Sequence, residues 1–194
     1  MQSDVQKPTL AYFHLGGKGE VARLALEVAG VDYHYHSITY KNSPGESWEE
    51  YKNKHADELT FGQIPHYKEP GGMLDCAPFN FYFDVDNIFS FCLTIGVSIV
   101  QSSSITRYVA RKYGLNGSNE HEAVAIDVLF EGVLDLLTAV AKVQWADESN
   151  RANEANNLFT QVAPKHLANF QRALEHNHGG QGNFNRQFLL PFGF

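Results

Sequence analysis

The sequence is poor in cysteine, with only two among 194 residues. Cys76 and Cys92 are too few for the disulfide framework of a small secreted domain, and no set of zinc ligands with a recognisable spacing accompanies them. We therefore expect two reduced thiols and no metal site.

Long hydrophobic runs are also missing. The longest, from Ile88 to Val100, is interrupted by Ser and Thr and is shorter than the roughly 20 residues of a membrane-spanning helix. The first residues, MQSDVQKPTLAYF, contain no apolar stretch preceded by basic residues, the pattern of a secretory signal. These features favour a cytoplasmic protein without a membrane partner.

Basic residues are fewer than acidic ones, with 15 Lys and Arg against 22 Asp and Glu and a formal net charge of -7. No basic patch marks a nucleic-acid surface, so we expect no nucleic-acid partner. Hydrophobic residues make up 43% of the chain and charged residues 19%, which argues against disorder. This length suits one domain or two small ones.

The first half alternates strand and helix patterns. Thr9 to Leu15 is rich in β-branched and aromatic residues, which predicts a strand, and apolar residues at helical spacing predict a helix from Glu20 to Ala29, closed by Gly30. A second strand is expected in DYHYHSITY, a short helix in SPGESWEEYKNKH and a third strand in IPHYKE. The pattern is a βαβ unit followed by another strand.

The second half is dominated by helical periodicity. QSSSITRYVARKYG predicts a helix that starts at a Ser cap and ends at Gly114, and the polar stretch LNGSNEHE follows as a linker. Two apolar stripes then recur at helical spacing, one between Val124 and Val140 and one between Phe159 and Leu174. We therefore predict an α/β domain over residues 8–113 and an all-α domain over residues 114–194.

Three short motifs have residues suited to binding an anion or a peptide. Tyr12 ends the first strand just before a glycine-rich turn, where its hydroxyl could meet an anion near the next helix, although such a tyrosine more often only packs in the core. In GQIP, a cis Pro65 would leave the Ile64 backbone open to an extended peptide, but trans is the commoner form. Gln101 and Ser102 begin a helix and suit a carboxylate, or Ser102 or Ser103 simply caps that helix.

The order of these motifs resembles the tyrosine-type cytosolic glutathione transferases of the alpha, mu, pi and sigma classes. The resemblance covers about Thr9 to Met73 and Val100 to His178. The matching residues are Tyr12-Phe13, Trp48, Gly62-Gln63-Ile64-Pro65, Gln101-Ser102, Ile105, Arg107 and Tyr108.

This resemblance implies a thioredoxin-like N-terminal domain that binds glutathione as co-substrate, and an all-α C-terminal domain that lines the pocket for a hydrophobic electrophile. Tyr12 would hydrogen-bond the glutathione sulfur and favour the thiolate. The remaining positions would hold the tripeptide. Trp48 and Lys52 would meet its glycine carboxylate, with Lys54 as a less favoured alternative to Lys52. The Ile64 backbone beside Pro65 would pair with its cysteine, and Gln63, Gln101 and Ser102 would hold its γ-glutamyl group. Glu131 would reach the γ-glutamyl amine in the other subunit, which implies a homodimer.

The sequence departs from this family pattern in three places. The turn after Tyr12 has Gly16 and Lys18 where the family usually has two arginines, and a lysine cannot reproduce the donor geometry of an arginine. An apolar segment, residues 75–99, interrupts a predicted hairpin, although loops of this length are uncommon and usually polar. The C-terminal residues after GGQG do not continue the family pattern, so we expect an incomplete helical domain.

These features predict a detoxification transferase that joins the glutathione thiolate to hydrophobic electrophiles, with Lys18 as a further contact of the thiolate. Isomerase or peroxidase activity would use the same site. The alternatives are a non-catalytic protein that binds glutathione or apolar ligands, and an inactive chain from a mis-spliced gene in which residues 75–99 are retained intron.

Overall fold

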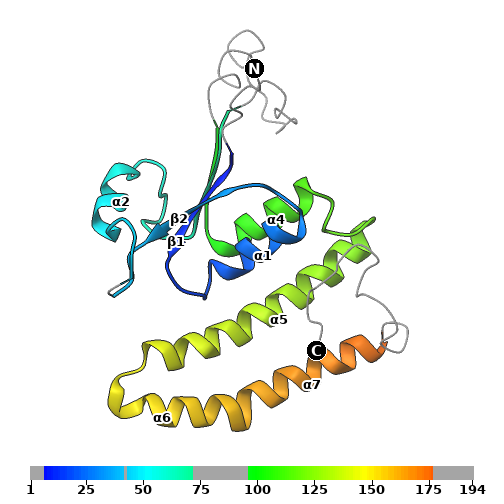
Figure 1. The fold of residues 1–194 in the computed structure, drawn as a ribbon. Coiled ribbons are helices and arrows are strands. Elements are labelled where there is room, and N and C mark those ends of the chain that lie inside the picture. The colour runs from blue at the N-terminus through cyan, green and yellow to red at the C-terminus, as the bar shows by residue number, and fades with distance from the viewer. Residues whose placement is uncertain (1–6, 42, 72–95, 177–194) are drawn as a thin grey trace. The chain divides into compact units, whose positions relative to one another are not determined.

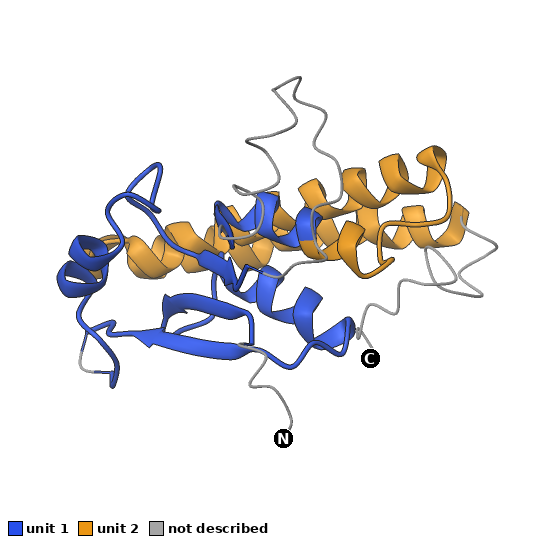
Figure 2. Ribbon diagram, turned by 90° about the horizontal axis from the view of Figure 1, so that it is seen from above, with its two compact units in different colours: residues 1–108 blue, residues 109–194 orange. Residues whose placement is uncertain are grey.

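A computed structural model describes residues 7–41, 43–71 and 96–176 of the chain. It contains two compact units, Met1–Tyr108 and Val109–Phe194, coloured separately in Figure 2. The division falls inside one helix: the first unit ends at Tyr108, five residues before residue 113, where the sequence pattern predicts the end of the first domain. Each unit is described by itself.

The first unit is built on a four-stranded mixed sheet. Its strands are β1 (Thr9–Phe13), β2 (His34–Ile38), β3 (His66–Glu69) and β4 (Val97–Val100), in the order β2-β1-β3-β4. β1 and β2 are parallel, whereas β3 runs antiparallel to both β1 and β4. The βαβ unit and the following strand predicted from the sequence are therefore present.

Three helices accompany this sheet: α1 (Glu20–Val28), α2 (Trp48–Lys54) and α4 (Ser102–Lys112). In Figure 1, α1 and α4 run side by side, and α2 lies apart from them. Ser47 begins α2 with a capping box, in which its hydroxyl accepts from the backbone of Glu50 and the Glu50 carboxylate accepts in return. This cap explains why so short a helix starts at a defined residue.

One hydrophobic cluster joins α2 to the sheet. Its buried members are Ala11, Ile38, Tyr51, Leu59 and Val100, and the partly buried side chains of Phe13, Trp48 and Ile64 pack against it. Burial of such side chains stabilises a fold by about 1.5–3 kcal/mol each. Trp48 and Ile64 are predicted site residues, and Phe13 adjoins Tyr12. Because all three pack on this cluster, the core also determines where the candidate site lies.

The position of β4 corrects one boundary of the apolar segment. Residues 97–99, which the family pattern assigned to the insertion, pair with β3: Tyr67 lies opposite Ile99, and Glu69 lies opposite Val97. Residues 97–99 therefore belong to the sheet, where as an extended strand they pair with the outer backbone groups of β3. Residues 75–95, like the C-terminal residues after His176, lie outside the described part of the chain.

The second unit is helical throughout its described part. It contains α5 (Glu120–Trp145), α6 (Glu148–Asn157), a π-helical turn at Leu158–Val162 and α7 (Ala163–His176). In α5, α6, the π-helical turn and α7, only Leu158 is buried, whereas Val128 and Phe159 are 67% and 71% exposed. The two apolar stripes predicted from the sequence thus lie on α5 and on the segment from α6 to α7, but they are not buried as a core.

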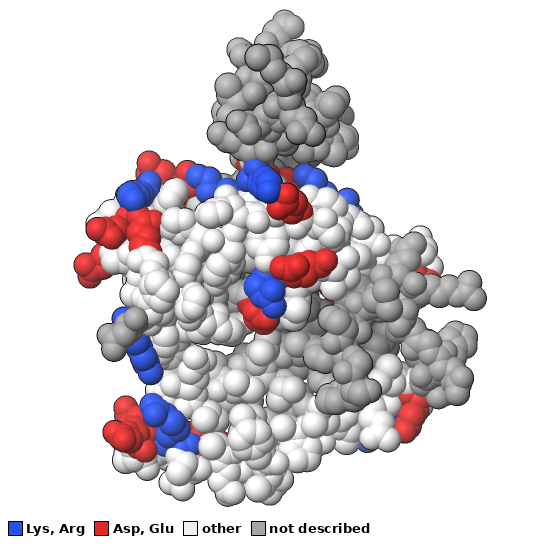
Figure 3. Space-filling view, in the orientation of Figure 1, with Lys and Arg blue, Asp and Glu red and all other residues white. Residues whose placement is uncertain are grey.

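On the face in Figure 3, acidic and basic side chains lie close together, notably around α2. Among the described residues, the structure has no helix with both the length and the apolar character needed to cross a membrane.

Candidate functional site

The strand register brings three separate motifs to one end of the sheet. Ala11 of β1 lies opposite His66 of β3, and His66 lies opposite Val100 of β4. Because β3 is antiparallel to both neighbours, the end of β1, the start of β3 and the end of β4 coincide. Tyr12 follows Ala11, Pro65 precedes His66 and Gln101 follows Val100. The pairing of the strands therefore places these three residues close together.

Tyr12 is held inside the glycine-rich turn. Its side chain is 9% exposed, and the backbone N–H groups of Lys18 and Gly19 donate hydrogen bonds to its oxygen. Burial raises the pKa of Tyr12 above its ordinary value, and these two hydrogen bonds oppose part of that effect. The hydroxyl therefore keeps its proton at neutral pH and can donate it in a hydrogen bond.

Glycine is required where the turn crosses the tyrosine ring. A Cβ atom at Gly19 would lie 2.4 Å from the Tyr12 ring carbons Cγ and Cδ1, far inside van der Waals contact. Gly19 is also the residue before α1, so the helix starts directly beside the ring. The glycine-rich turn thus places backbone donors and a helix N-terminus at the tyrosine, as an anion site needs.

Trp48 and Lys52 form a second part of the site. The Trp48 ring packs on Phe13 with centroids 6.1 Å apart, and Phe13 in turn lies 5.6 Å from the Tyr12 ring. The Lys52 ammonium lies 6.0 Å from the centroid of the Trp48 ring. Trp48 therefore both packs on the core and connects the lysine to the tyrosine.

Lys52 and Lys54 have different surroundings. The Lys52 side chain lies beside Gly62, where an added Cβ would be 3.7 Å from its ammonium, next to the GQIP motif. The Lys54 ammonium instead donates to the Glu46 carboxylate. Of the two lysines, Lys52 alone lies beside the motif, and within the part of the chain that the structure describes it forms no ion pair with a carboxylate.

The GQIP motif and the start of α4 meet through their glutamines. The Gln101 amide donates to the Gln63 side-chain oxygen at 3.1 Å, although 38 residues separate them. Gln101 has φ +73°, a left-handed conformation that is uncommon for a residue with a side chain and often occurs at functional sites. The Ile64–Pro65 peptide bond is cis, the alternative that is less common for proline in general.

Ser102 follows as the first residue of α4 and is 8% exposed. Its position at a helix N-terminus, next to the left-handed Gln101, places free backbone N–H groups beside the paired glutamines. An uninterrupted set of contacts thus leads from Tyr12 through Phe13, Trp48, Lys52 and the GQIP motif to Gln101 and Ser102.

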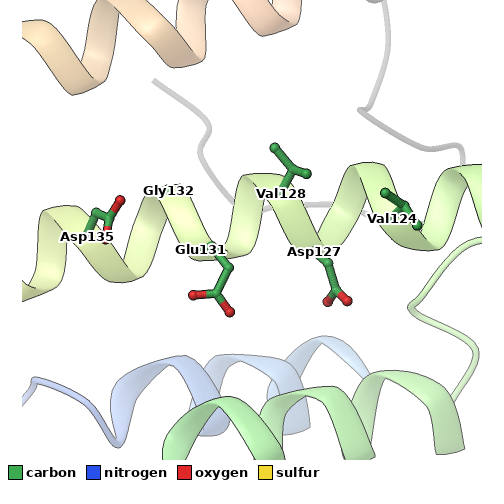
Figure 4. Close-up of a pocket in the computed structure, with 6 residues that line it drawn as sticks. All are labelled: Val124, Asp127, Val128, Glu131, Gly132 and Asp135. Atoms are coloured by element: carbon green, nitrogen blue, oxygen red, sulfur yellow. The ribbon is translucent and has the colours of Figure 1, made fainter.

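Two predicted residues stand outside this set. Lys18 has an exposed side chain, and only its backbone N–H contacts Tyr12. Glu131 lies in the second unit, on the exposed surface of α5. There it lines an open hollow, and Figure 4 shows its carboxylate and that of Asp127 projecting from the same side of the helix. The other lining residues are Val124, Val128, Gly132 and Asp135.

Phe13 and Gly19 were not among the predicted site residues. Gly19 belongs to the GGKG stretch, which the sequence pattern indicated only as a break after the strand. Phe13 was noted only as part of a motif, and its packing between Tyr12 and Trp48 depends on a tertiary contact across 35 residues.

Comparison with known proteins finds relatives by sequence and by fold. No protein-family model matches the chain. Among curated proteins, it is 30% identical over 159 residues to "Glutathione S-transferase P 10" of Caenorhabditis elegans, covering 81% of this chain and 60% of that protein. It is 31% identical over 172 residues to "Glutathione S-transferase P 2" of Bufo bufo, covering 88% and 65% respectively. The chain therefore spans less than two thirds of the length of these relatives.

Solved structures share the fold at lower identity. The sigma-class GST of Fasciola hepatica superposes with a TM-score of 0.66 at 19% identity, covering 94% of this chain and 72% of that structure. The pi-class glutathione S-transferase of Onchocerca volvulus gives 0.63 at 24% identity, with 92% and 68% covered. These superpositions confirm the predicted fold class, a thioredoxin-like α/β domain followed by an all-α domain. In sequence the chain is thus similar to named glutathione S-transferases, and its fold is the one that these solved structures share.

Proposed function

We propose that this protein is a glutathione transferase that joins the thiolate of glutathione to a hydrophobic electrophile. The observation that carries the proposal is the setting of Tyr12, whose protonated hydroxyl lies under two backbone donors at the same sheet end as the Gln63–Gln101 pair. This setting suits a sulfur anion in a bound peptide.

The energy available from Tyr12 matches the chemical need. A free thiol has a pKa near 8.5, so lowering it by two units corresponds to about 2.7 kcal/mol. A hydrogen bond to a charged group contributes about 1.5–3 kcal/mol. The Tyr12 hydroxyl, which remains protonated because burial raises its pKa, would then suffice to keep glutathione as the thiolate. The thiolate attacks the electrophilic carbon, and the leaving group or the double bond takes the electron pair.

The rest of glutathione would lie along the sheet end. Lys52, with Trp48 beneath its stem, would meet the glycine carboxylate, and the backbone of Ile64 before Pro65 would pair with the cysteine unit. Gln63, Gln101 and Ser102 would hold the γ-glutamyl group, whose carboxylate suits the N-terminus of α4.

The second unit would select the electrophile and complete the site in a homodimer. Glu131 is acidic and exposed on α5, so its carboxylate could bind an amine of a ligand held by another subunit. In a homodimer, Glu131 of the partner subunit would pair with the γ-glutamyl amine. The half-exposed apolar residues of α5 and α7 would then line a pocket for apolar substrates.

The test is the variant Tyr12→Phe, assayed with a chloronitrobenzene acceptor. We expect turnover to fall at least about tenfold, the effect of losing about 1.4 kcal/mol of transition-state stabilisation. Retention on immobilised glutathione should remain, since the other contacts persist. Tyr33→Phe is the matched control, because it removes a hydroxyl that donates to Glu27 on the surface. Full activity in Tyr12→Phe would refute the role of Tyr12.

A non-catalytic binding protein is the second candidate. The observation that favours it is the turn itself: Gly16 carries no side chain and the Lys18 side chain is exposed, so no arginine fork faces the sulfur position. Under this alternative, the parent protein would be retained on glutathione but would show no turnover with any acceptor, and Tyr12→Phe would change nothing.

A further inference from the structure

Three potential metal ligands converge where the turn after α2 meets the sheet. They are His55 and Glu58 in the turn and His66 at the start of β3. Glu58 Oε2 lies 3.2 Å from His55 Nδ1 and 3.6 Å from His66 Nε2, and the three ligand atoms all lie within 4.8 Å of one another. None of these residues belongs to the candidate glutathione site.

The two distances from Glu58 Oε2 are close to those between the ligands of a tetrahedral metal. Zinc binds histidine nitrogen and carboxylate oxygen at about 2.0–2.2 Å, so that two ligand atoms of one zinc lie about 3.3 Å apart. Two imidazoles with one carboxylate is a donor set that zinc takes, with the fourth position left for water. We propose that His55, Glu58 and His66 form a zinc-binding site.

The fold holds these ligands in position before any metal arrives. The backbone N–H groups of Glu58 and Leu59 both donate to the His55 carbonyl at 3.0 Å, which closes the turn. His66 is fully buried, and its Nδ1 lies 2.8 Å from the Tyr51 hydroxyl. A hydrogen bond to the other ring nitrogen is the usual support of a histidine ligand, since it orients the ring and selects the tautomer.

The site is accessible from solvent on one side. The side chains of His55 and Glu58 are 24% and 35% exposed, whereas His66 closes the inner side. The Ser98 hydroxyl lies 2.8 Å from His66 Nε2 and would give up this hydrogen bond when a metal takes the nitrogen lone pair. Ser98 is itself exposed, so water replaces the lost partner at little cost.

Lys68 is the group that opposes metal binding. Its ammonium lies 2.8 Å from both oxygens of Glu58 and supplies the positive charge that the carboxylate otherwise receives from a metal. A zinc ion must therefore draw Oε2 away from the ammonium. It follows that removing this charge should strengthen zinc binding, while removing a ligand should weaken it.

The test is calorimetric titration of the full chain with zinc chloride after chelator treatment and dialysis. We expect one zinc per chain. His55→Gln and Glu58→Gln should each raise the Kd at least about tenfold, the lower limit seen when even a supporting residue of a metal site is lost. Lys68→Gln should lower the Kd. His34→Gln, an exposed imidazole on β2, should leave the Kd unchanged.

Cobalt supplies a second measurement that does not depend on affinity. Substitution with Co²⁺ should give the visible absorption of a tetrahedral ion in the parent chain, and this absorption should be lost in Glu58→Gln. Far-ultraviolet circular dichroism and retention on glutathione should be unchanged in all four variants. The proposal is overturned if the parent binds no zinc, or if His55→Gln and Glu58→Gln bind it as tightly as the parent, since the metal would then lie on other imidazoles or on Cys76 and Cys92.

Discussion

Ser102 and Ser104 occupy the same turn of α4 but differ in burial, which allows a matched test of the γ-glutamyl position. Ser102 is 8% exposed and adjoins Gln101, whereas Ser104 is exposed. Ser102→Ala should weaken glutathione binding about tenfold, because it removes a hydrogen bond to a charged group worth about 1.5 kcal/mol. Calorimetric titration with glutathione measures this difference.

Ser104→Ala should bind glutathione like the parent. If both variants lost the same glutathione affinity, the cause would be a general effect on the start of the helix. If Ser102→Ala lost no affinity, Ser102 would not be a glutathione-binding residue.

Lys52 and Lys54 allow a similar comparison at the glycine carboxylate. Lys52 lies over Trp48 and beside Gly62, whereas Lys54 is paired with Glu46. Lys52→Ala should raise the KM for glutathione several-fold with little change in kcat, since this contact is equal in ground and transition states. Lys54→Ala should leave the KM unchanged. The reverse result would assign the carboxylate to Lys54, the alternative that the family pattern left open.

At the scale of elements, Glu46 ties β2 to α2. Its carboxylate accepts from the Lys54 ammonium and lies 2.9 Å from His36 Nε2. Lys54 is the main cause that lowers the pKa of Glu46 below its ordinary value, and His36 adds to the effect. A carboxyl group with a lower pKa in the folded state stabilises the fold above its unfolded pKa, and this contribution disappears as the pH falls through the folded value.

Glu46→Gln should therefore destabilise the protein at pH 7 by less than about 1 kcal/mol, the usual range for an ion pair near the surface. Urea denaturation should show this difference at pH 7, and the difference should vanish in acid well below the ordinary carboxyl pKa. Asp57→Asn, an exposed change in the turn after α2, should show no difference at either pH. A loss that persists in acid would mean that Glu46 acts through packing.

Most elements of the first unit could be predicted from local pattern. The helix expected from Glu20 to Ala29 is α1 (Glu20–Val28), and the strand expected in DYHYHSITY contains β2 (His34–Ile38). These predictions succeed because apolar spacing and caps act within a few residues. β4 was placed only at its last residue, because four residues directly after an apolar segment are too few for a strand period to separate them from it.

At the scale of the whole molecule, the correction to β4 yields a test of the apolar segment. Deleting residues 75–95 leaves residues 70–74 and 96 to connect β3 with β4, a length within the ordinary range of about 2–6 residues for such connections. We expect this deletion variant to be retained on glutathione at least as well as the parent, because the sheet and both glutamines remain.

Deleting residues 75–100 is the matched control. This deletion also removes β4, including Val100, which packs in the core and precedes Gln101. The thermal melt should therefore become non-cooperative, and retention on glutathione should be lost. If the shorter deletion lost retention as well, residues 75–95 would be needed for binding.

The sequence by itself determined the resemblance to glutathione transferases, because each motif that carries this resemblance is a set of residues close together in the chain. Tyr12 before its glycine turn, the GQIP motif and the serine at the head of α4 were all recognisable in this way. The positions of these motifs relative to one another depended on the strand register, which local pattern does not contain.

Only the tertiary structure decided which lysine lies beside the motif, where the sheet resumes after the apolar segment, and that His66 meets His55 and Glu58. These features join residues that are distant in sequence, and their contacts arise from pairing between strands and from packing of α2 on the sheet. Neither the spacing nor the composition of the sequence predicts that His66, in a strand, and His55, in a turn, lie close together. Their contact arises only when the chain folds.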